Sequence, residues 1–321
     1  MKKSIFAVAL LSAGTAWAQA NNLPPQPINI IVGFAAGGST DTVARIVGKE
    51  LSERLKRTVV VVNKPGASGT IAAAEVGRAK PDSNTFLMMT TPTLLARHVY
   101  KDIRFDVTQE LTPISIVYDM PNVLVVNKKH TPEVNNLQDV IQFARKKPGG
   151  VSFGSGGTGS MGQLLVEDLK KNQKFEAEHI PYQGGAPALM ALLGGQIDMV
   201  SSESVAALPH IRSGKLHAVA VGSAERLNMF PGTPTFAEQG MPGFTSVAWG
   251  SFLGPKSIPP QTVALLTKEM REILNDPKVR DQLLKAGAIA VYGDPEQTAR
   301  RLREDDKRWG DVARNAGISI N

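Results

Sequence analysis

Glycine-rich stretches with hydroxyl side chains stand at four places in this chain. They read GFAAGGSTD at 33–41, GASGT at 66–70, GSGGTGS at 154–160 and PYQGGAP at 181–187. Glycine lets the backbone approach a ligand closely, and the free N–H groups of a helix N-terminus favour an anion. The chemistry predicted from these residues is the binding of a small carboxylate by backbone N–H groups, hydroxyls and Tyr182.

Two of the stretches allow a second interpretation. The 154–160 stretch matches G-x-G-x-x-G, and Glu176 and Glu178 follow at about the spacing of a ribose-binding acid in a dinucleotide site. In the fourth stretch, Tyr182 could equally pack half-buried under its own loop. Serine and threonine are more frequent in 154–160 than a dinucleotide site needs, so the pattern favours a carboxylate.

Composition and residue patterns argue against several other functions. The 321 residues contain no cysteine, which excludes disulfides and thiolate metal sites. Ser68, Ser155 and Ser160 lack the flanking glycine pair of a nucleophile elbow, and the five histidines are scattered without metal-ligand spacing. The formal charge is +7, but the basic residues are dispersed. We therefore expect no catalytic residue, no metal, no cofactor and no nucleic-acid partner.

The glycine-rich stretches stand between strand-like and helix-like segments. In the first half, strands are predicted at Ile28–Val32, Thr58–Val62 and Thr85–Thr90, with a helix over about 40–56. Continuous apolar character at Thr58–Val62 is typical of a sheet covered on both sides. The second half repeats the order, with a strand at Val151–Phe153 before the third stretch. This alternation predicts mostly parallel sheets flanked by helices.

Further segments predict how the halves are connected. Ile114–Tyr118 and Asn122–Val126 are expected to be two strands separated by Met120-Pro121, and Val247–Leu253 a strand that leads the chain back. Asp294-Pro295 is expected to cap a last helix that runs to about residue 314. The layout predicts an α/β protein of two lobes joined by two crossing segments. Lobe 1 comprises residues 24–121 plus 249–321, and lobe 2 comprises 122–248.

The N-terminal segment has the pattern of an export signal. Lys2 and Lys3 precede an apolar run from Ile5 to Leu11, and Ala16-Trp17-Ala18 forms a small-x-small cleavage box. The sequence predicts that residues 1–18 are a signal peptide cleaved on export to the periplasm. Exported proteins of this kind are binders, hydrolases or redox proteins.

Taken in order, these stretches resemble the substrate-binding proteins of tripartite tricarboxylate transporters, often called the Bug family. The similarity covers nearly the whole mature chain and includes IIVGFAAGGSTDTVAR, VVVVNKPGASGTIAAAEVGRAKPDSNTFLM, VSFGSGGTGSMGQLLVEDL and IPYQGGAPALMALLGGQIDM. The resemblance implies a periplasmic binding protein fold of type II that closes on a small carboxylate and presents it to a membrane transporter. It also implies that Ala36 to Ser39, Ser68 with Gly69, and Ser155 to Gly159 hold that carboxylate.

The chain departs from the family pattern at a few positions. Gly33 stands where family members often have proline, and Thr93 begins a stretch that replaces one with an asparagine donor. Ser202 stands where many members carry aspartate, and Glu203 is its neighbour. If Glu203 reaches the cleft, it would attract an ammonium group, whereas a cleft with Ser202 alone suits a plain carboxylate. Together the candidate ligand-binding residues are Ala36, Gly37, Gly38, Ser39, Asp41, Ser68, Gly69, Thr91, Ser155, Gly156, Gly157, Thr158, Gly159, Tyr182, Gly184, Ser202 and Glu203.

The function expected from the sequence is therefore that of a monomeric periplasmic solute-binding protein. Its partners would be a small organic carboxylate and the membrane permease subunits of a transporter. A dicarboxylate, a tricarboxylate, an acidic amino acid and an aromatic acid are all compatible with the donors. Two alternatives remain open on the same layout: a sensor that signals to a membrane kinase, and an exported enzyme.

Overall fold

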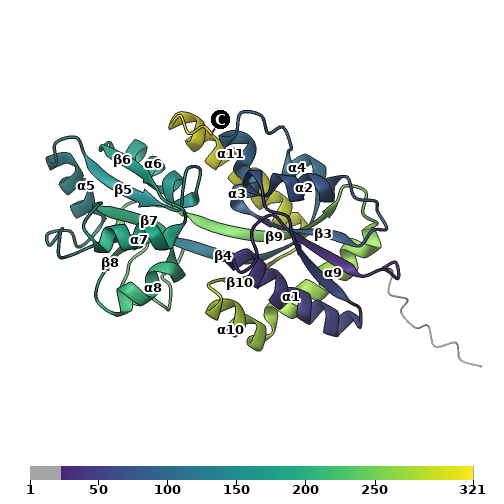
Figure 1. Cartoon of the computed structure of the whole chain (residues 1–321). Helices are drawn as coiled ribbons and strands as arrows, with labels where there is room; N and C mark the ends of the chain where they lie inside the picture. Colours follow the sequence, from purple (N-terminus) through teal and green to yellow (C-terminus); the bar gives the residue numbers. More distant parts are fainter. Residues whose placement is uncertain (1–22, 321) are drawn as a thin grey trace, which may run out of the picture.

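The computed structural model describes residues 23–320 and shows two α/β lobes joined by two long strands (Figure 1). The predicted signal peptide, residues 1–18, lies outside the described residues. Among the helices that are described, none combines the length and the apolar character needed to cross a membrane.

Lobe 1 holds the N-terminal and C-terminal parts of the chain. Its strands are β1 (Ile28–Val32), β2 (Val59–Asn63), β3 (Thr85–Thr90) and β10 (Ile289–Gly293). Its helices are α1 (Ser39–Leu55), η1 (Ala67–Gly69), α2 (Thr70–Gly77), α3 (Thr91–Val99), α4 (Val107–Glu110), α9 (Pro260–Asn275), α10 (Pro277–Lys285) and α11 (Pro295–Asn315). The predictions for β1, α1 and β3 are confirmed to within two residues at each end.

Lobe 2 is formed by the middle of the chain. Its strands are β5 (Val151–Ser155), β6 (Ala177–Pro181), β7 (Met199–Glu203) and β8 (His217–Val221). Its helices are α5 (Leu137–Lys146), α6 (Met161–Gln173), α7 (Gly185–Leu193), α8 (Ser204–Arg212) and η2 (Ala237–Gln239).

Two strands, β4 (Leu111–Val126) and β9 (Val247–Pro255), connect the lobes (Figure 1). From Leu111 to Pro121, β4 pairs antiparallel with β9, and from Asn122 onward it pairs with β7 and β8. The prediction of two strands broken at Met120-Pro121 is therefore wrong. Pro121, which has no N–H to donate, stands where β4 exchanges one set of partners for another, so the strand continues through it.

Sheet order corrects two further details of the sequence interpretation. The α/β fold is confirmed, but β4 and β9 pair antiparallel with their neighbours, so the sheets are mixed rather than mostly parallel. Among the described residues, strand β2 pairs only with β1, and it lies at the edge of the order β2-β1-β3-β9-β4-β7-β5-β6. Its Val60 is 41% exposed, so this strand is not covered on both sides as its apolar run predicted.

Each lobe buries apolar side chains on both faces of its sheet. Along β4, Val123 and Val125 pack with α7 and α8, whereas Leu124 and Val126 pack with α5 and α6 on the other face. Helix α6 also packs against lobe 1, because its Met161 joins the buried cluster formed by α2, α3 and α11. The lobes are therefore in contact beside the crossing strands as well as through them.

Candidate functional site

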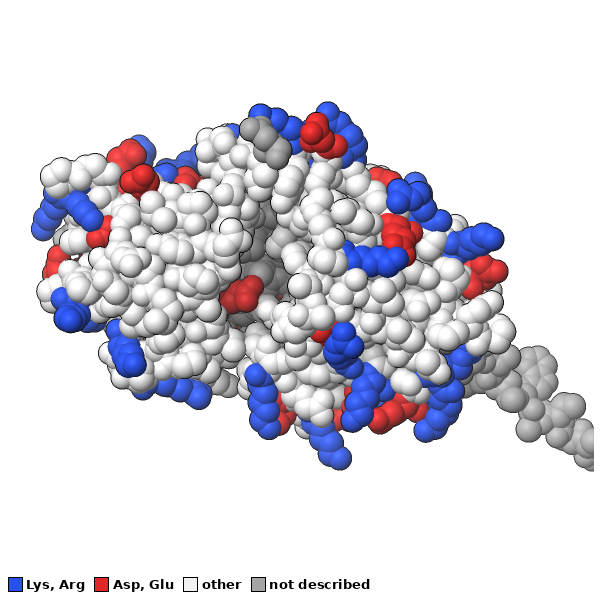
Figure 2. Space-filling view, viewed as in Figure 1, with Lys and Arg blue, Asp and Glu red and all other residues white. Residues whose placement is uncertain are grey.

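A pocket of about 400 Å³ lies between the two lobes, where Figure 2 shows the molecule hollowed. We call it the cleft pocket. It is lined by Phe34, Gly38, Ser39, Thr40, Thr90, Thr91, Pro92, Tyr118, Met120, Asn122, Gly156, Ser160, Met161, Gly162, Gly184, Gly185, Ser201, Ser202, Glu203, Ala206, Ala248 and Trp249. Both lobes and both crossing strands thus contribute to its walls.

Helix N-termini from both lobes meet at this pocket. Within residues 23–320, five helices have their N-cap residue in its wall, namely Gly38 for α1, Thr90 for α3, Ser160 for α6, Gly184 for α7 and Glu203 for α8. The first N–H groups of a helix have no partner within the helix and carry partial positive charge. The wall therefore offers donors to an anion from several directions.

Some predicted binding residues lie in this wall and others do not. Those in the wall are Gly38, Ser39, Thr91, Gly156, Gly184, Ser202 and Glu203. Those outside it are Ala36, Gly37, Asp41, Ser68, Gly69, Ser155, Gly157, Thr158, Gly159 and Tyr182.

Asp41 fixes the shape of the first glycine-rich stretch. Its buried carboxylate accepts hydrogen bonds from the Arg45 Nε and the Gly37 N–H, each at 2.9 Å, and from the Asn63 amide at 2.9 Å. The Arg45 hydrogen bond, helped by the other two and opposed by burial, lowers the pKa of Asp41 to about 2. Asp41 therefore positions the loop and α1 rather than facing the cleft pocket.

Ser155 has the same role in the third stretch. Its hydroxyl is fully buried and lies 2.7 Å from the His179 Nε2 and 3.0 Å from the Ser160 Oγ. It also bonds with the Gly157 carbonyl and N–H groups at 3.1 and 3.2 Å. This serine–histidine pair is thus enclosed in the loop, and it positions Gly156 and Ser160 at the pocket wall.

Local packing explains the positions of three further predicted residues outside the wall, Ser68, Gly69 and Tyr182. The Ser68 hydroxyl donates to the Tyr100 hydroxyl at 3.1 Å, and a Cβ on Gly69 would meet the Thr93 Oγ1 at 2.6 Å. Tyr182 is half-buried and packs against the apolar cluster of α7 and α8, which is the second interpretation given above. Thr158 is exposed on its loop.

One glycine-flanked serine does occur, in GVSFG at 150–154. Ser152 lies inside β5 rather than at a strand-to-helix turn, so the segment is not a nucleophile elbow. Its hydroxyl donates to Asp198 at 2.9 Å, and its N–H donates to the same carboxylate at 2.7 Å. The described residues also contain no cluster of histidine and acidic side chains that could hold a metal ion.

The cleft pocket has one acidic side chain among the described residues that line it. This is Glu203, and the same described wall contains no lysine, arginine or histidine. Figure 2 shows acidic atoms at the hollow, while the basic residues are spread over the outer surface. Burial between the lobes raises the pKa of Glu203 and, more strongly, that of Tyr118, whose hydroxyl lies 3.3 Å from the Thr40 Oγ1.

Several wall residues were missed by the sequence reasoning because they lie on the crossing strands. Tyr118 and Asn122 come from β4 and Trp249 comes from β9. The backbone N–H of Trp249 donates to the Thr91 Oγ1 at 2.9 Å, so β9 is bound to the start of α3. A sequence signal existed, since these residues belong to the segments predicted to cross between lobes.

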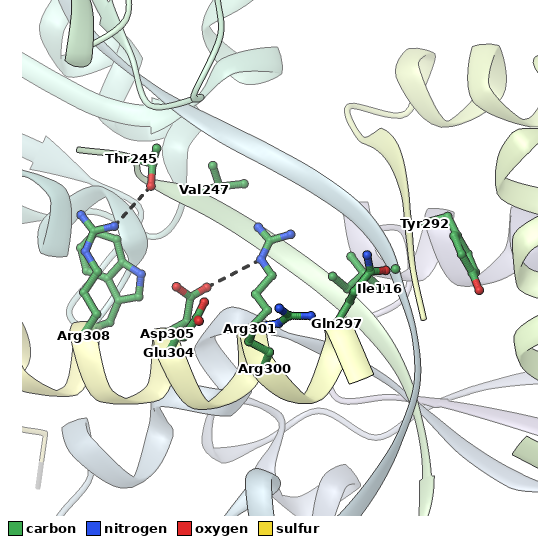
Figure 3. Close-up of a pocket in the computed structure, with 12 residues that line it drawn as sticks. Ile116, Thr245, Val247, Tyr292, Gln297, Arg300, Arg301, Glu304, Asp305 and Arg308 are labelled. Atoms are coloured by element: carbon green, nitrogen blue, oxygen red, sulfur yellow. Dashed lines mark hydrogen bonds and ion pairs between the residues drawn. The ribbon is translucent and has the colours of Figure 1, made fainter. Parts of the chain in front are cut away.

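A second pocket of about 410 Å³ lies between α11 and the crossing strands (Figure 3). We call it the α11 pocket. Arg301 pairs with Asp119 of β4 at 2.7 Å, and its guanidinium stacks 4.5 Å from the centre of the Trp249 ring. Arg308 donates to the Thr245 hydroxyl and to Asp168 of α6, both at 3.3 Å. Helix α11 thus contacts both crossing strands and lobe 2.

Comparison with known proteins shows what this architecture is similar to. Residues 43–318 match the family model described as tripartite tricarboxylate transporter family receptor. Protein BugT of Bordetella pertussis is 33% identical over 320 residues, which cover 99% of this chain and 98% of that protein.

Solved structures agree with the sequence comparison. The periplasmic binding protein BugD is 32% identical, with a TM-score of 0.75 over 92% of this chain and 100% of its own. MatC from Rhodopseudomonas palustris, solved with bound malate, is 30% identical, with a TM-score of 0.74 over 90% of this chain and 99% of its own. The matched model, the relative and the two-lobed fold together show that this chain belongs to the tripartite tricarboxylate transporter receptor family.

Proposed function

We propose that this protein is a periplasmic receptor that captures a small organic carboxylate in the cleft pocket and delivers it to the permease of a tripartite tricarboxylate-type transporter. The observation that carries the proposal is the convergence of five helix N-termini, among the described residues, on one pocket shared by two lobes. Such N-termini stabilise an anion by about 0.3–1 kcal/mol each when exposed, and by up to about 2 kcal/mol when partly buried.

Capture is proposed to occur by closure of the lobes. The bending point is the place where β4 leaves β9 for β7 and β8, at Pro121 and Asn122, together with the start of β9 at Val247. The moving units are the two lobes predicted from the sequence, 24–121 plus 249–321 and 122–248. A ligand that contacts the N-termini of both lobes binds the closed state better than the open state, and closure then follows from that difference.

The family and its periplasmic members support the location and the partner. MatC binds malate, a small dicarboxylate, on the same fold. The export signal predicted over residues 1–18 accords with a receptor that meets its permease at the outer face of the inner membrane. We thus also propose that the protein is exported, that it works with a permease and that it catalyses no reaction.

A screen of small carboxylates tests the binding step. Purified protein is heated with each acid in turn, and a true ligand raises the melting temperature because it binds only the folded state. Small-angle scattering with and without that ligand then tests closure, for which we expect a smaller radius of gyration in its presence. An unchanged radius at saturating ligand would rule out closure while leaving the binding function intact.

A further inference from the structure

Asn122 and Glu203 face each other in the floor of the cleft pocket. They are register partners in the antiparallel pair of β4 and β7, and both line the pocket. Directly opposed residues of such a pair project to the same side of the sheet, with Cβ atoms about 4.5–5.5 Å apart. The amide of Asn122 and the carboxylate of Glu203 therefore form one local surface.

Both side chains carry acceptor atoms that the protein leaves without a donor. Asn122 is 1% exposed, and its Oδ1 has no hydrogen-bond partner, while its Nδ2 lies 3.5 Å from the Ser201 Oγ. Glu203 is the N-cap of α8 but makes no capping bond, and its carboxylate has no ion pair within residues 23–320. A buried acceptor without a donor is costly, and the Asn122 Oδ1 is one. The Glu203 carboxylate beside it is exposed to the pocket without a countercharge in the described wall, so the two together indicate a ligand that supplies donors.

We propose that Glu203 and Asn122 bind a protonated amino group, so that the ligand of this receptor is an amino acid rather than a plain carboxylate. An ammonium group has three N–H donors and a positive charge, which match one anionic and one neutral acceptor. The inference rests on the proposed carboxylate function, because the carboxylate of the same ligand would occupy the helix N-termini.

The other wall residues fit a ligand whose amino group lies at Glu203 and Asn122 and whose carboxylate lies at the helix N-termini. The first turn of α1, at Ser39 and Thr40, and the first turn of α6, at Met161 and Gly162, offer backbone N–H donors for a carboxylate. No basic side chain among the described wall residues offsets Glu203. A plain dicarboxylate would therefore place a second anion beside Glu203 without a countercharge, whereas a zwitterion satisfies both parts of the pocket.

Matched pairs of ligands that differ only in the amino group test the inference. We would measure the affinity of the wild-type protein by calorimetry for L-aspartate against succinate, L-glutamate against glutarate, and L-phenylalanine against 3-phenylpropionate. We expect the amino member of the best pair to bind at least about 10-fold more tightly. Glu203→Gln should weaken that member by about 10- to 100-fold and leave its deaminated partner unchanged or tighter.

Two further variants separate recognition from folding. Glu178→Gln makes the same change at an exposed position of β6, outside the pocket, and should leave both affinities unchanged. Asn122→Leu removes the other acceptor, and its melting temperature without ligand shows whether the fold is kept. We expect it to reduce the preference for the amino member as well.

The outcomes distinguish this inference from the function on which it rests. If the deaminated acid binds as tightly as its amino partner, or if Glu203→Gln keeps the preference, the inference is overturned and carboxylate binding stands. If folded wild-type protein binds no member of any pair, the proposed function is overturned for these acids, and the inference with it.

Discussion

The indole N–H of Trp249 donates a hydrogen bond of 2.6 Å to Asp305, and this bond joins the cleft pocket to the α11 pocket. Trp249 lines the first pocket and Asp305 lines the second. On its other side, the Trp249 backbone is bonded to Thr91 at the start of α3. A single residue of β9 thus connects the proposed ligand site with the C-terminal helix.

Removing Asp305 should therefore weaken ligand binding although Asp305 does not line the cleft pocket. Asp305→Ala leaves the Trp249 N–H without its acceptor and frees the ring to move, so we expect affinity to fall about 2- to 10-fold. Calorimetry with the tightest acid from the screen measures the effect. Glu304→Ala, which changes the next residue of the same helix, should bind as the wild type does, and equal affinities of all three proteins would contradict the coupling.

A side chain on Gly38 should block the cleft pocket without unfolding the protein. Gly38 has φ −73°, which any residue adopts, and a Cβ there would meet only the Ala35 carbonyl oxygen, at 3.5 Å. Because Gly38 lines the pocket, we expect Gly38→Val to lower ligand affinity about 10-fold or more at a nearly unchanged melting temperature.

Two other glycines make this substitution interpretable. Gly232 has open space around it and lies outside the cleft pocket, so Gly232→Val should change neither affinity nor stability. Gly157 has φ +126°, and a Cβ there would approach the Tyr182 carbonyl oxygen at 3.3 Å. Gly157→Val should therefore lower the melting temperature, which Gly38→Val should not do. A Gly38→Val protein that binds normally would show that the ligand occupies another part of the cleft.

The pH dependence of stability should reveal His179. Burial, aided by the charge of Lys170, lowers the pKa of His179 from 6.5 in the unfolded chain to about 4. The unfolded chain therefore takes up this proton first as the pH falls. His179 contributes its full stability above pH 6.5, and that contribution declines between pH 6.5 and pH 4, by about 1–2 kcal/mol because the ring is only partly buried.

Urea unfolding of the wild type and of His179→Gln at pH 7.5 and pH 4.5 measures the contribution of His179 to the free energy of unfolding. We expect the wild type to lose more free energy of unfolding than the variant between the two pH values. His210→Gln, which removes a histidine from α8, should lose as much as the wild type. Parallel losses in the wild type and His179→Gln would mean that His179 titrates normally in the folded protein.

The sequence predicted the parts of the fold that depend on local patterns. Asp294 does cap α11, and the capping box formed with Gln297 lies within four consecutive residues. The helix predicted over 40–56 begins at Ser39, and its first residues line the cleft pocket as the glycine-rich pattern indicated. Each of these features is set by neighbours in the chain, so a pattern in the sequence is enough to find it.

Features that depend on strand order could not be found in this way. The edge position of β2 and the pairing of Asn122 with Glu203 follow from pairing between distant segments.

The roles of Asp41 and Ser155 were not predicted from the sequence either. Both residues have the types and spacing of ligand contacts, but their hydrogen bonds hold the glycine-rich loops in shape. Residue type alone does not distinguish a residue that touches a ligand from one that positions the loop beneath it.

Arg308 should act as a tether between the lobes. It projects from α11, stacks 4.2 Å from the centre of the Trp309 ring, and donates to Asp168 of α6 in lobe 2. The two side chains are 33% and 14% exposed, so solvent screens their attraction only in part. A double-mutant cycle of Arg308→Ala and Asp168→Ala should give a coupling energy of about 0.5–1.5 kcal/mol in the free energy of unfolding.

The same variants should change the motion of the lobes. Without the tether, amide hydrogen exchange should become faster at residues 240–246, which lead into β9, and at the C-terminal end of α6. Lys307→Ala, at an exposed position one residue earlier on α11, serves as the matched control and should leave exchange in both segments unchanged. Unchanged exchange in Arg308→Ala, together with a coupling energy near zero, would show that packing of α6 on lobe 1 through Met161 holds the lobes without help from this pair.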